Sequence, residues 1–382
     1  MRILVLGADG YLGWPTAMHF AGQDNEVMAL DNGAKREWEM EVDAGPLWHL
    51  PSLHQRARAY KEHSRRSIEV QMGDVTDYRL LENVFESFRP DAIVHYAEQP
   101  SAPYSMRGYK KAISTQVNNV AGTLAVLWAM HKHAPHAHLI KLGTMGEYGT
   151  PNIDIEEGWL EVEHKGRRDR MLYPKKPGSF YHLSKVHDSH NIEAACRWWG
   201  LRATDLNQGV VYGIDTPQTT IDPSLATSFH YDAVFGTVLN RFVVQAVAGI
   251  PLTVYGKGGQ TRGYLNINDT LQCVELAVNN PAKAGEFRVF NQFTETFSVN
   301  DLAVRVERVG RQFHLPVHIE HLPNPRIEAE EHYYNPRNSA LMQLGLKPRL
   351  LSDEVVADMM AKVMRNKHLI DHTIVPPTIT WK

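Results

Sequence analysis

Residues 1–13, MRILVLGADGYLG, decide the fold that this sequence can adopt. Their apolar run from Ile3 to Leu6 is typical of a β-strand that is buried on both faces. Three glycines follow at once and open a helix: Gly7, Gly10 and Gly13. A pyrophosphate needs backbone N–H groups that approach closely and a helix N-terminus that points at it, and glycine permits both. The stretch therefore indicates a phosphate cradle, although three glycines also suit a plain tight turn.

Strand and helix patterns alternate along the chain from this turn to about residue 207. Such alternation predicts an α/β fold, a parallel, doubly wound sheet with right-handed crossovers. The further strands are expected at 26–30, 68–72, 92–95, 138–142 and 201–207, and the helices at about 11–22, 76–88, 114–131 and 180–199.

After about residue 209 the rhythm breaks, and we expect a smaller α/β domain interleaved with the main sheet. The main domain is expected to span 1–212 plus about 264–296, and the smaller domain about 213–263 plus 297–382. A helix at 237–248 and strands at 252–255, 287–290 and 317–321 are expected in this half.

Two insertions interrupt the alternating pattern, at 33–66 and 151–178. Loops of this length are usually functional or lid-like. The second insertion is expected to form a hairpin with Lys165-Gly166 at its tip, and the basic residues there suit a solvated turn.

Composition excludes several classes of protein. The 382 residues carry a net charge of −3, which gives no basic balance for nucleic acid, and no apolar run approaches the ~20 residues of a membrane span. Two cysteines, Cys196 and Cys273, cannot form a disulfide framework, so we expect buried, inert thiols in the cytoplasm. No leader segment is expected before the first strand. The histidines do not follow the spacing of zinc ligands, so no metal is expected.

Two carboxylates follow expected strands. Asp31 ends the second strand, where a carboxylate accepts hydrogen bonds from adenosine ribose hydroxyls and repels a 2′-phosphate. This position favours NAD over NADP. Asp74 follows the third strand and either reaches the adenine edge or caps the next helix, or does both.

Tyr181 and Lys185 lie one helical turn apart, at the start of the helix expected after the fifth strand. A phenol has a pKa of ~10, and a nearby ammonium lowers it by stabilising the phenolate. Thr144 lies at the carboxyl end of the fifth strand, where open α/β sheets bind ligands. The three residues form a candidate catalytic set, and their position carries more weight than their spacing.

These residues together resemble the extended short-chain dehydrogenase/reductase superfamily that modifies nucleotide sugars. The runs at 118–123, 207–213 and 251–256 fit the same pattern. The resemblance implies a Rossmann-type sheet that binds NAD, and a smaller domain in which 251–256 lines a uridine pocket. It also implies that Arg262 holds the diphosphate, which suits the fork of an arginine.

The resemblance implies the following sets of binding residues. The cofactor set adds Asp9, Tyr11, Leu12, Asn32, Arg36, Val75, Tyr96, Ala97, Glu98, Asn118, Leu142 and Gln208 to the glycines, Asp31, Asp74, Tyr181 and Lys185. The substrate set is Gln99, Ser101, Thr144, Glu147, Tyr181, Asn207, Thr237, Asn240, Thr253, Val254, Tyr255, Gln260, Arg262 and Arg326. A homodimer or homotetramer paired through the helices at 114–131 and 180–199 is also implied.

Four longer runs, at 142–157, 181–191, 255–265 and 324–334, resemble the family of UDP-sulfoquinovose synthases. This resemblance implies that UDP-glucose and sulfite are joined by NAD-dependent oxidation at carbon 4, loss of the 6-hydroxyl, sulfite addition at carbon 6 and return of the hydride. One departure is Pro100, where the family leads us to expect arginine. Free sulfite and a sulfur-donor protein both stay open as the source of sulfur.

The elimination step lacks an obvious acid and base. Hexose 4,6-dehydratases carry Asp and Glu directly after the threonine, where this chain has Met145 and Gly146. Glu147 and His182 are the nearest groups, and each suits either proton transfer or a structural contact.

Other assignments stay open as well. Ser101 and Arg107 are candidates for holding sulfite. Arg326 suits either the diphosphate or a surface ion pair, and Trp198 and Trp199 suit packing. Two alternatives to the synthase remain, a UDP-hexose 4-epimerase or 4,6-dehydratase, and a non-catalytic NAD-binding sensor or scaffold.

Overall fold

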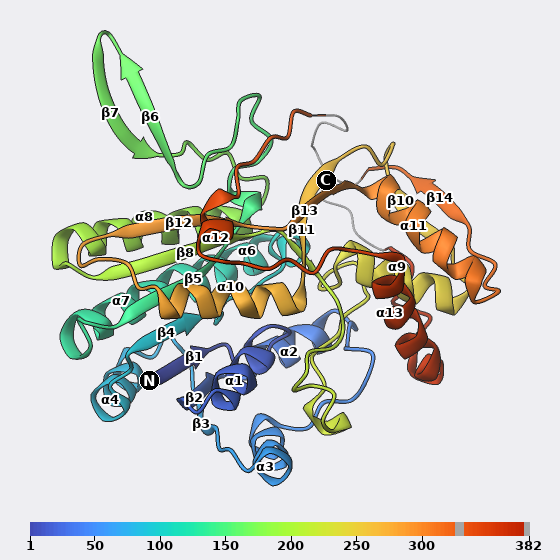
Figure 1. Ribbon diagram of the computed structural model, residues 1–382, viewed down its shortest axis with the longest axis horizontal. Coiled ribbons are helices and arrows are strands. Elements are labelled where there is room, and N and C mark those ends of the chain that lie inside the picture. The colour runs from blue at the N-terminus through green and yellow to red at the C-terminus, as the bar shows by residue number, and fades with distance from the viewer. Residues whose placement is uncertain (325–331, 378–382) are drawn as a thin grey trace.

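The computed structural model describes residues 1–324 and 332–377. Its centre is a seven-stranded parallel sheet in the order β12-β8-β5-β4-β1-β2-β3 (Figure 1). The predicted doubly wound α/β fold is confirmed. The strands are β1 (Arg2–Leu6), β2 (Glu26–Asp31), β3 (Glu69–Met72), β4 (Ala92–His95), β5 (His138–Thr144), β8 (Arg202–Gln208) and β12 (Phe287–Gln292).

Helices cover both faces of this sheet because alternate strand residues point to opposite sides. Ile3 and Val5 of β1 belong to one hydrophobic core, and Leu4 and Leu6 belong to the other. The first core packs against α1 (Gly13–Gly22), α3 (Leu53–Ser64), α10 (Ile267–Asn279) and α12 (Ser339–Gln343), and the second against α4 (Tyr78–Phe88), α7 (Gly122–His133) and α8 (Phe180–Trp199).

A separate core, which includes Phe242, Val306 and Met360, lies in the second half of the chain. Since β12 and α10 of that half return to the central sheet, the two halves interleave as expected. The predicted domain boundaries stay a prediction. The elements around this core are α9 (Val238–Ala248), α11 (Val299–Gln312), α13 (Asp353–Arg365), β9 (Val210–Tyr212), β10 (Leu252–Tyr255), β11 (Thr261–Asn266), β13 (Glu295–Ser298) and β14 (Ile319–Leu322).

Both insertions are structured. The first holds α2 (Ala34–Glu41) and α3, and the second holds the antiparallel hairpin of β6 (Trp159–His164) and β7 (Arg167–Leu172). Lys165 and Gly166 at its tip adopt left-handed φ angles of 52° and 75°, which confirms the predicted turn. Figure 1 shows the hairpin projecting away from the body of the molecule.

The helix expected at 114–131 begins earlier and contains a π-turn. It runs through α6 (Tyr109–Gln116), the π-turn Val117–Ala121 and α7. A Cβ at Gly122 would lie 2.9 Å from Cγ2 of Val75, so the helix approaches the loop after β3 closely at this glycine. The short elements are α5 (Ala102–Ser105) and the 3₁₀ turns Met145–Glu147, Pro223–Leu225 and Lys367–Leu369.

Two further expectations concern buried side chains. Cys196 and Cys273 are buried as expected, and burial raises the pKa of both thiols to about 12. Trp199 packs as expected, with its ring stacked 4.6 Å from that of His131. The same expectation is wrong for Trp198, which is 66% exposed. Within residues 1–324 and 332–377, no helix is both long and apolar enough to cross a bilayer.

Candidate active site

A cleft with two lobes opens at the carboxyl ends of the central strands. The first lobe has a volume of about 370 Å³ and extends from the glycine turn after β1 to Tyr181 on α8. The second lobe has a volume of about 680 Å³ and extends from Thr144 to Arg262 on β11. Four residues of the predicted site line both lobes and therefore mark their junction: Thr144, His182, Gln208 and Thr237.

The glycine turn forms one end of the first lobe. Gly7 has a φ of 80°, and a Cβ there would lie 2.6 Å from the amide nitrogen of Ala97. A Cβ at Gly13 would lie 2.0 Å from the carbonyl oxygen of Gly7. Only glycine fits both positions, and the start of α1 carries no side-chain cap. The turn therefore leaves backbone N–H groups available to a phosphate.

Asp31 lines the first lobe at the end of β2. Its carboxylate accepts hydrogen bonds from the amide nitrogens of Asp9 (2.9 Å) and Gly33 (2.7 Å). Burial raises the pKa of Asp31 above its ordinary value, and these two bonds oppose the rise. The two bonds thus fix the orientation of the carboxylate at the edge of the first lobe.

Asp9, Arg36 and Asp74 of the predicted cofactor set do not line the cleft. Asp9 pairs with Arg36 at 2.6 Å and with the buried Arg56 at 3.0 Å. These ion pairs stabilise the glycine turn that carries Asp9. Asp74 accepts from Asn32 at 2.8 Å and so positions a residue that does line the lobe. The alternative that Asp74 caps α4 is wrong, because Asp77 makes the capping bonds.

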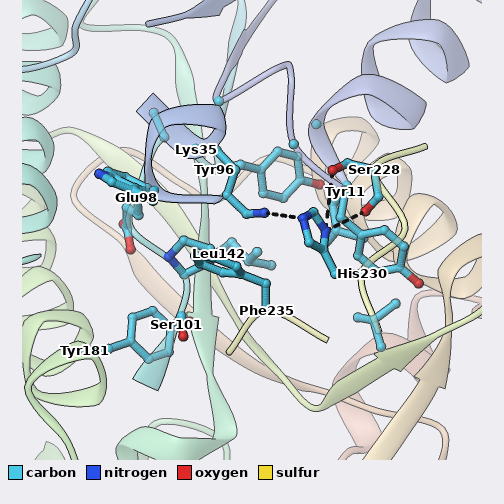
Figure 2. A pocket seen from close by; sticks show the side chains of 18 of the residues that line it. Tyr11, Lys35, Tyr96, Glu98, Ser101, Leu142, Tyr181, Ser228, His230 and Phe235 are labelled. Carbon is cyan, nitrogen blue, oxygen red and sulfur yellow. Dashed lines mark hydrogen bonds between the residues drawn. The ribbon is translucent and has the colours of Figure 1, made fainter. Parts of the chain in front are cut away.

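Tyr181 lies in the first turn of α8 and lines the first lobe beside Ser101 and Glu98 (Figure 2). Lys185 is 3% exposed and does not line the cleft. Its ammonium donates to the carbonyl oxygen of Leu142 and pairs with Glu98. The Nζ atom lies 5.7 Å from the centre of the Tyr181 ring.

The expected effect of Lys185 on Tyr181 is corrected by this arrangement. Burial raises the pKa of Tyr181 above its ordinary value, and the negative charge of Glu98 raises it further. The ammonium of Lys185 is held by Glu98, so its charge is already compensated. Among the nearby charges, that of Lys141 opposes the rise.

Glu147 is fully buried and does not line either lobe, which corrects its expected contact with substrate. One carboxylate oxygen accepts from the amide nitrogen of Thr144 at 3.1 Å, and the other pairs with Lys175 and accepts from Ser189 at 3.1 Å. These contacts, a cap and a salt bridge, match the structural role that the sequence left open for Glu147. Glu147 therefore fixes the backbone that carries Thr144.

His182 lies at the junction of the lobes, with Nδ1 3.0 Å from the hydroxyl of Ser179. A Cβ at Gly146 would lie 2.4 Å from Nε2 of His182. The absence of a side chain at residue 146 therefore makes room for the imidazole. His182, unlike Glu147, is located where a proton could be exchanged with a ligand.

The second lobe contains buried polar atoms without a hydrogen-bond partner among the described residues. They are Oγ1 of Thr237, Nε of Arg241, Oη of Tyr255 and Oε1 of Gln260, and all four residues line this lobe. Such atoms are costly to bury unless a ligand or water satisfies them. The lobe therefore suits a ligand that both donates and accepts hydrogen bonds.

Some expected substrate residues serve other purposes. Asn207 donates to the Tyr148 hydroxyl at 2.8 Å, Gln99 bonds to Ser101 and Thr115, and neither residue lines the cleft. Val254 is buried, and Arg107 is exposed and lines neither lobe. Ser101 lines the first lobe but donates to the carbonyl oxygen of Val234 at 2.6 Å. Arg326 lies outside the described residues.

The other predicted residues line the cleft. Of the cofactor set, Gly7, Gly10, Tyr11, Leu12, Gly13, Asp31, Asn32, Val75, Tyr96, Ala97, Glu98, Asn118, Leu142 and Gln208 line the first lobe. Asn240, predicted in the substrate set, lines the first lobe and not the second. In the second lobe they are Thr253, Tyr255, Gln260 and Arg262.

Sequence reasoning missed the residues that cover the first lobe from α2 and from the loop after β9. Lys35 and His230 line this lobe with their side chains 3.2 Å apart (Figure 2), and Glu39 lies 2.8 Å from His230. The only sequence signal for these residues was the length of the two segments that carry them, the insertion at 33–66 and the loop after β9. In the second lobe, Arg241 was missed, although it is a lone charge in an apolar helix.

Comparison with known proteins agrees with this geometry. Residues 3–291 match the model of the NAD dependent epimerase/dehydratase family. The chain belongs to this family. It is an enzyme whose cofactor is NAD, which fits the glycine turn and the fixed carboxylate of Asp31.

Two relatives match over the whole chain. UDP-sulfoquinovose synthase from the chloroplast of Spinacia oleracea is 52% identical over 381 residues, which cover 100% of this chain and 79% of the relative. UDP-sulfoquinovose synthase from Sulfolobus acidocaldarius is 43% identical over 386 residues, which cover 100% of this chain and 98% of the relative.

Solved structures share the fold at low identity. UDP-glucose 4-epimerase from Bifidobacterium longum, in complex with NAD+ and UDP, has a TM-score of 0.72 at 18% identity and covers 97% of this chain and 100% of its own. UDP-glucuronic acid 4-epimerase from Bacillus cereus, with UDP-glucuronic acid and NAD, has a TM-score of 0.69 at 18% identity and covers 95% and 100%.

Proposed function

We propose that this enzyme makes UDP-sulfoquinovose from UDP-glucose and sulfite. The observation that carries the proposal is the similarity, over all of the chain, to two relatives of that name. The position of Thr144 at the junction of the two lobes, with Tyr181 in the first lobe, supports it further, because such a cleft can hold a cofactor and a nucleotide sugar end to end.

In this proposal the first lobe holds the cofactor. The glycine turn would bind its pyrophosphate and Asp31 its adenosine ribose, and the cofactor held there would supply a reversible hydride acceptor. Tyr181 takes the proton of the sugar 4-hydroxyl, and the Thr144 hydroxyl donates to the same oxygen. The ion pair of Lys185 and Glu98 lies beside Tyr181 and holds the surrounding side chains in place.

The second lobe would hold the uridine diphosphate. Its unpartnered polar atoms offer donors and acceptors, and the guanidinium groups of Arg241 and Arg262 line it. Arginine forks match the geometry of phosphate oxygens. Arg326 would add to this set, as the family resemblance implies.

His182 would serve the elimination and addition steps at the junction. The 4-ketone acidifies the proton on carbon 5, whose removal expels the 6-hydroxyl, and sulfite then adds to carbon 6. His182 is the imidazole that lines both lobes, so it can carry the proton between carbon 5 and the departing oxygen. The reactive enone would have to be kept from water while it awaits sulfite. Free sulfite is the proposed nucleophile, and a sulfur-donor protein is the alternative source.

The test uses purified protein without added NAD, given UDP-glucose with and without sulfite, and mass spectrometry of the nucleotide sugars. We expect a product that appears only with sulfite and carries one sulfonate in place of one hydroxyl. Tyr181→Phe should abolish it. UDP-galactose, or a stable 4-keto-6-deoxy sugar, would replace the proposal with an epimerase or a dehydratase. No turnover by a protein that retains NAD would leave the sensor alternative.

We also propose that the enzyme forms a homodimer or homotetramer through α6, α7 and α8. Large apolar side chains of this surface are exposed, including Tyr109, Val117, Trp128 and Trp198. Figure 1 shows α7 and α8 at the end of the molecule away from α11 and α13. Light scattering during size-exclusion chromatography would measure the mass, and a monomer would overturn this proposal.

A further inference from the structure

Beneath the junction of the lobes, four charged side chains are buried together: Glu98, Lys141, Lys185 and Asp188. Lys141 pairs with one carboxylate oxygen of Glu98, and Lys185 pairs with the other. Lys141 also lies 3.1 Å from Asp188. We call this group the charge cluster. Of its members only Glu98 lines the cleft, and the mechanism above uses Lys185 but has no use for Lys141.

We propose that Lys141 is a positioning residue, which holds Glu98 and thereby sets the place of Lys185 and the charge beneath Tyr181. This proposal rests on the proposed function in one respect only, because one of its two tests uses UDP-glucose as the substrate. Lys141 itself does not line either lobe, so it acts through Glu98 and not on the substrate.

The geometry of the charge cluster supports this role. Lys141 extends from β5, Lys185 and Asp188 from α8, and Glu98 follows β4, so the cluster joins three elements of the fold. The ammonium groups of both lysines donate to the same carbonyl oxygen, that of Leu142. Without Lys141, one oxygen of Glu98 would lose its cation, and Lys185 would have to satisfy the whole carboxylate.

The count of charges leads to the same conclusion. The charge cluster holds two carboxylates and two ammonium groups, and burial raises the pKa of Asp188 well above its ordinary value, so the two cations chiefly balance Glu98. Removing Lys141 takes one of these two cations from Glu98 in a buried site, which is costly. Burial would raise the pKa of Glu98, but the two ammonium groups, Lys141 first, bring it down to about 2. A less balanced Glu98 would oppose ionisation of Tyr181.

Other charged or titratable groups also face this region, and none of them replaces Lys141. Glu147 and Lys175 form their own pair, and Asp205 on β8 accepts from Ser189 at 2.9 Å. Burial lowers the pKa of His95 on β4 to about 3, so it is neutral at ordinary pH. The ring of His182 lies 5.1 Å from that of Tyr181, on the side of the cleft.

The experiment compares Lys141→Met with Lys141→Arg, Glu98→Gln and the double variant Lys141→Met/Glu98→Gln. The readout is the pH dependence of the reduction of bound NAD by UDP-glucose alone, which an epimerase or dehydratase would also perform. We expect the acidic limb of Lys141→Met to move up by about one pH unit, with about a tenfold lower rate at neutral pH. Glu98→Gln should move the acidic limb to lower pH. The acidic limb of the double variant should lie near that of the wild type.

A second readout needs no substrate. The ultraviolet titration of each protein is compared with that of the same protein carrying Tyr181→Phe, and the difference reports the ionisation of Tyr181. The tyrosinate should form at higher pH in Lys141→Met and at lower pH in Glu98→Gln. Thermal unfolding and the NAD content of each variant separate this effect from loss of structure.

An unmoved limb and an unmoved Tyr181 titration in folded Lys141→Met would overturn the proposal. If that variant does not fold, Glu98→Gln decides, because an unchanged or upward shift there contradicts the proposal equally well. A wild-type enzyme that reduces its NAD but gives no sulfite-dependent product would refute the proposed function and leave the role of Lys141 intact.

Discussion

Glu98 and Glu147 are two buried carboxylates that each pair with lysine and each contact a residue of α8, Lys185 and Ser189 respectively. Glu98 shares two ammonium groups and lines the cleft, whereas Glu147 pairs with Lys175, caps the turn at Thr144 and is sealed from the cleft. Sequence proximity to Thr144 favoured Glu147 as the reacting group, yet the structure turns it inward. The comparison teaches that proximity in the chain does not decide which carboxylate faces a ligand.

The largest expected effect tests whether Glu147 is structural. Glu147→Gln should lower the free energy of unfolding by about 3–5 kcal/mol, because the ammonium of Lys175 would be left buried without its carboxylate. Urea denaturation measures this loss. The double variant Glu147→Gln/Lys175→Met should recover much of it. A stable Glu147→Gln enzyme with a large loss of rate would instead make Glu147 a reacting group.

The next effect concerns His182, which takes the place that Glu147 was expected to fill. His182→Gln should lower the rate of sulfonated product formation by about a hundredfold or more, because a general acid and base is lost. Reduction of bound NAD by UDP-glucose should persist. Mass spectrometry and the absorbance of reduced nicotinamide measure the two steps. The matched control is His190→Gln, an exposed histidine further along α8. Equal loss of both steps in His182→Gln would contradict the assignment.

Unlike Glu98 and Glu147, whose charges are paired, the buried guanidinium of Arg241 has no carboxylate partner among the described residues. Arg241→Leu should raise KM for UDP-glucose by about ten- to a hundredfold with little change in kcat, because hydrogen bonds from a charged donor would be lost in the second lobe. Steady-state kinetics measure this change. Arg241→Lys, which keeps the charge but not the fork, should lie between the two. An unchanged KM in Arg241→Leu would assign Arg241 to packing.

The smallest effect concerns the pH dependence of stability, which should differ between the surroundings of Glu147 and those of Glu98. Asp205, near Glu147, has its pKa raised to about 6, chiefly by burial and then by the charge of Glu147. A raised pKa in the folded state gives stability that is present below pH ~4 and lost as the pH rises through 6. Asp205→Asn should therefore flatten the pH dependence of the free energy of unfolding between these two pH values. An unchanged slope would contradict the raised pKa.

Glu98 behaves with the opposite sign. Its pKa is about 2 in the folded state, so its contribution to stability is present above the unfolded value of ~4.3 and is lost as the pH falls toward 2. Glu98→Gln should flatten the curve in that lower window and leave the window of Asp205 alone. Acid denaturation of both variants in parallel would measure this difference.

Much of the fold could be predicted because its signals are local. The apolar run before Gly7 and the alternation of patterns predicted the strands of the central sheet and the phosphate cradle. The turn at Lys165-Gly166 was also predictable, because a loop between two strands must reverse the chain. Helix starts were less accurate, as at Tyr78, because Asp77 rather than Asp74 makes the capping bonds.

The candidate site was predicted less completely, because the orientation of side chains depends on contacts that are distant in the sequence. Lys35 and His230 are 195 residues apart and meet over the first lobe. Lys141 reads as one residue of a strand, and only the fold brings it to Glu98 and Asp188. The inward turn of Glu147 likewise depends on Lys175, which no local pattern connects to it.

The contact between Gly146 and His182 also limits how this enzyme can diverge. A side chain at residue 146 would meet the imidazole at 2.4 Å, so an acidic group there and the present position of His182 exclude each other. A lineage that gained the carboxylate first would displace its imidazole, and one that lost the imidazole first would have no replacement. A change of chemistry at this junction therefore begins with a displacement of the His182 ring, and a side chain introduced at position 146 should move the imidazole from its present position.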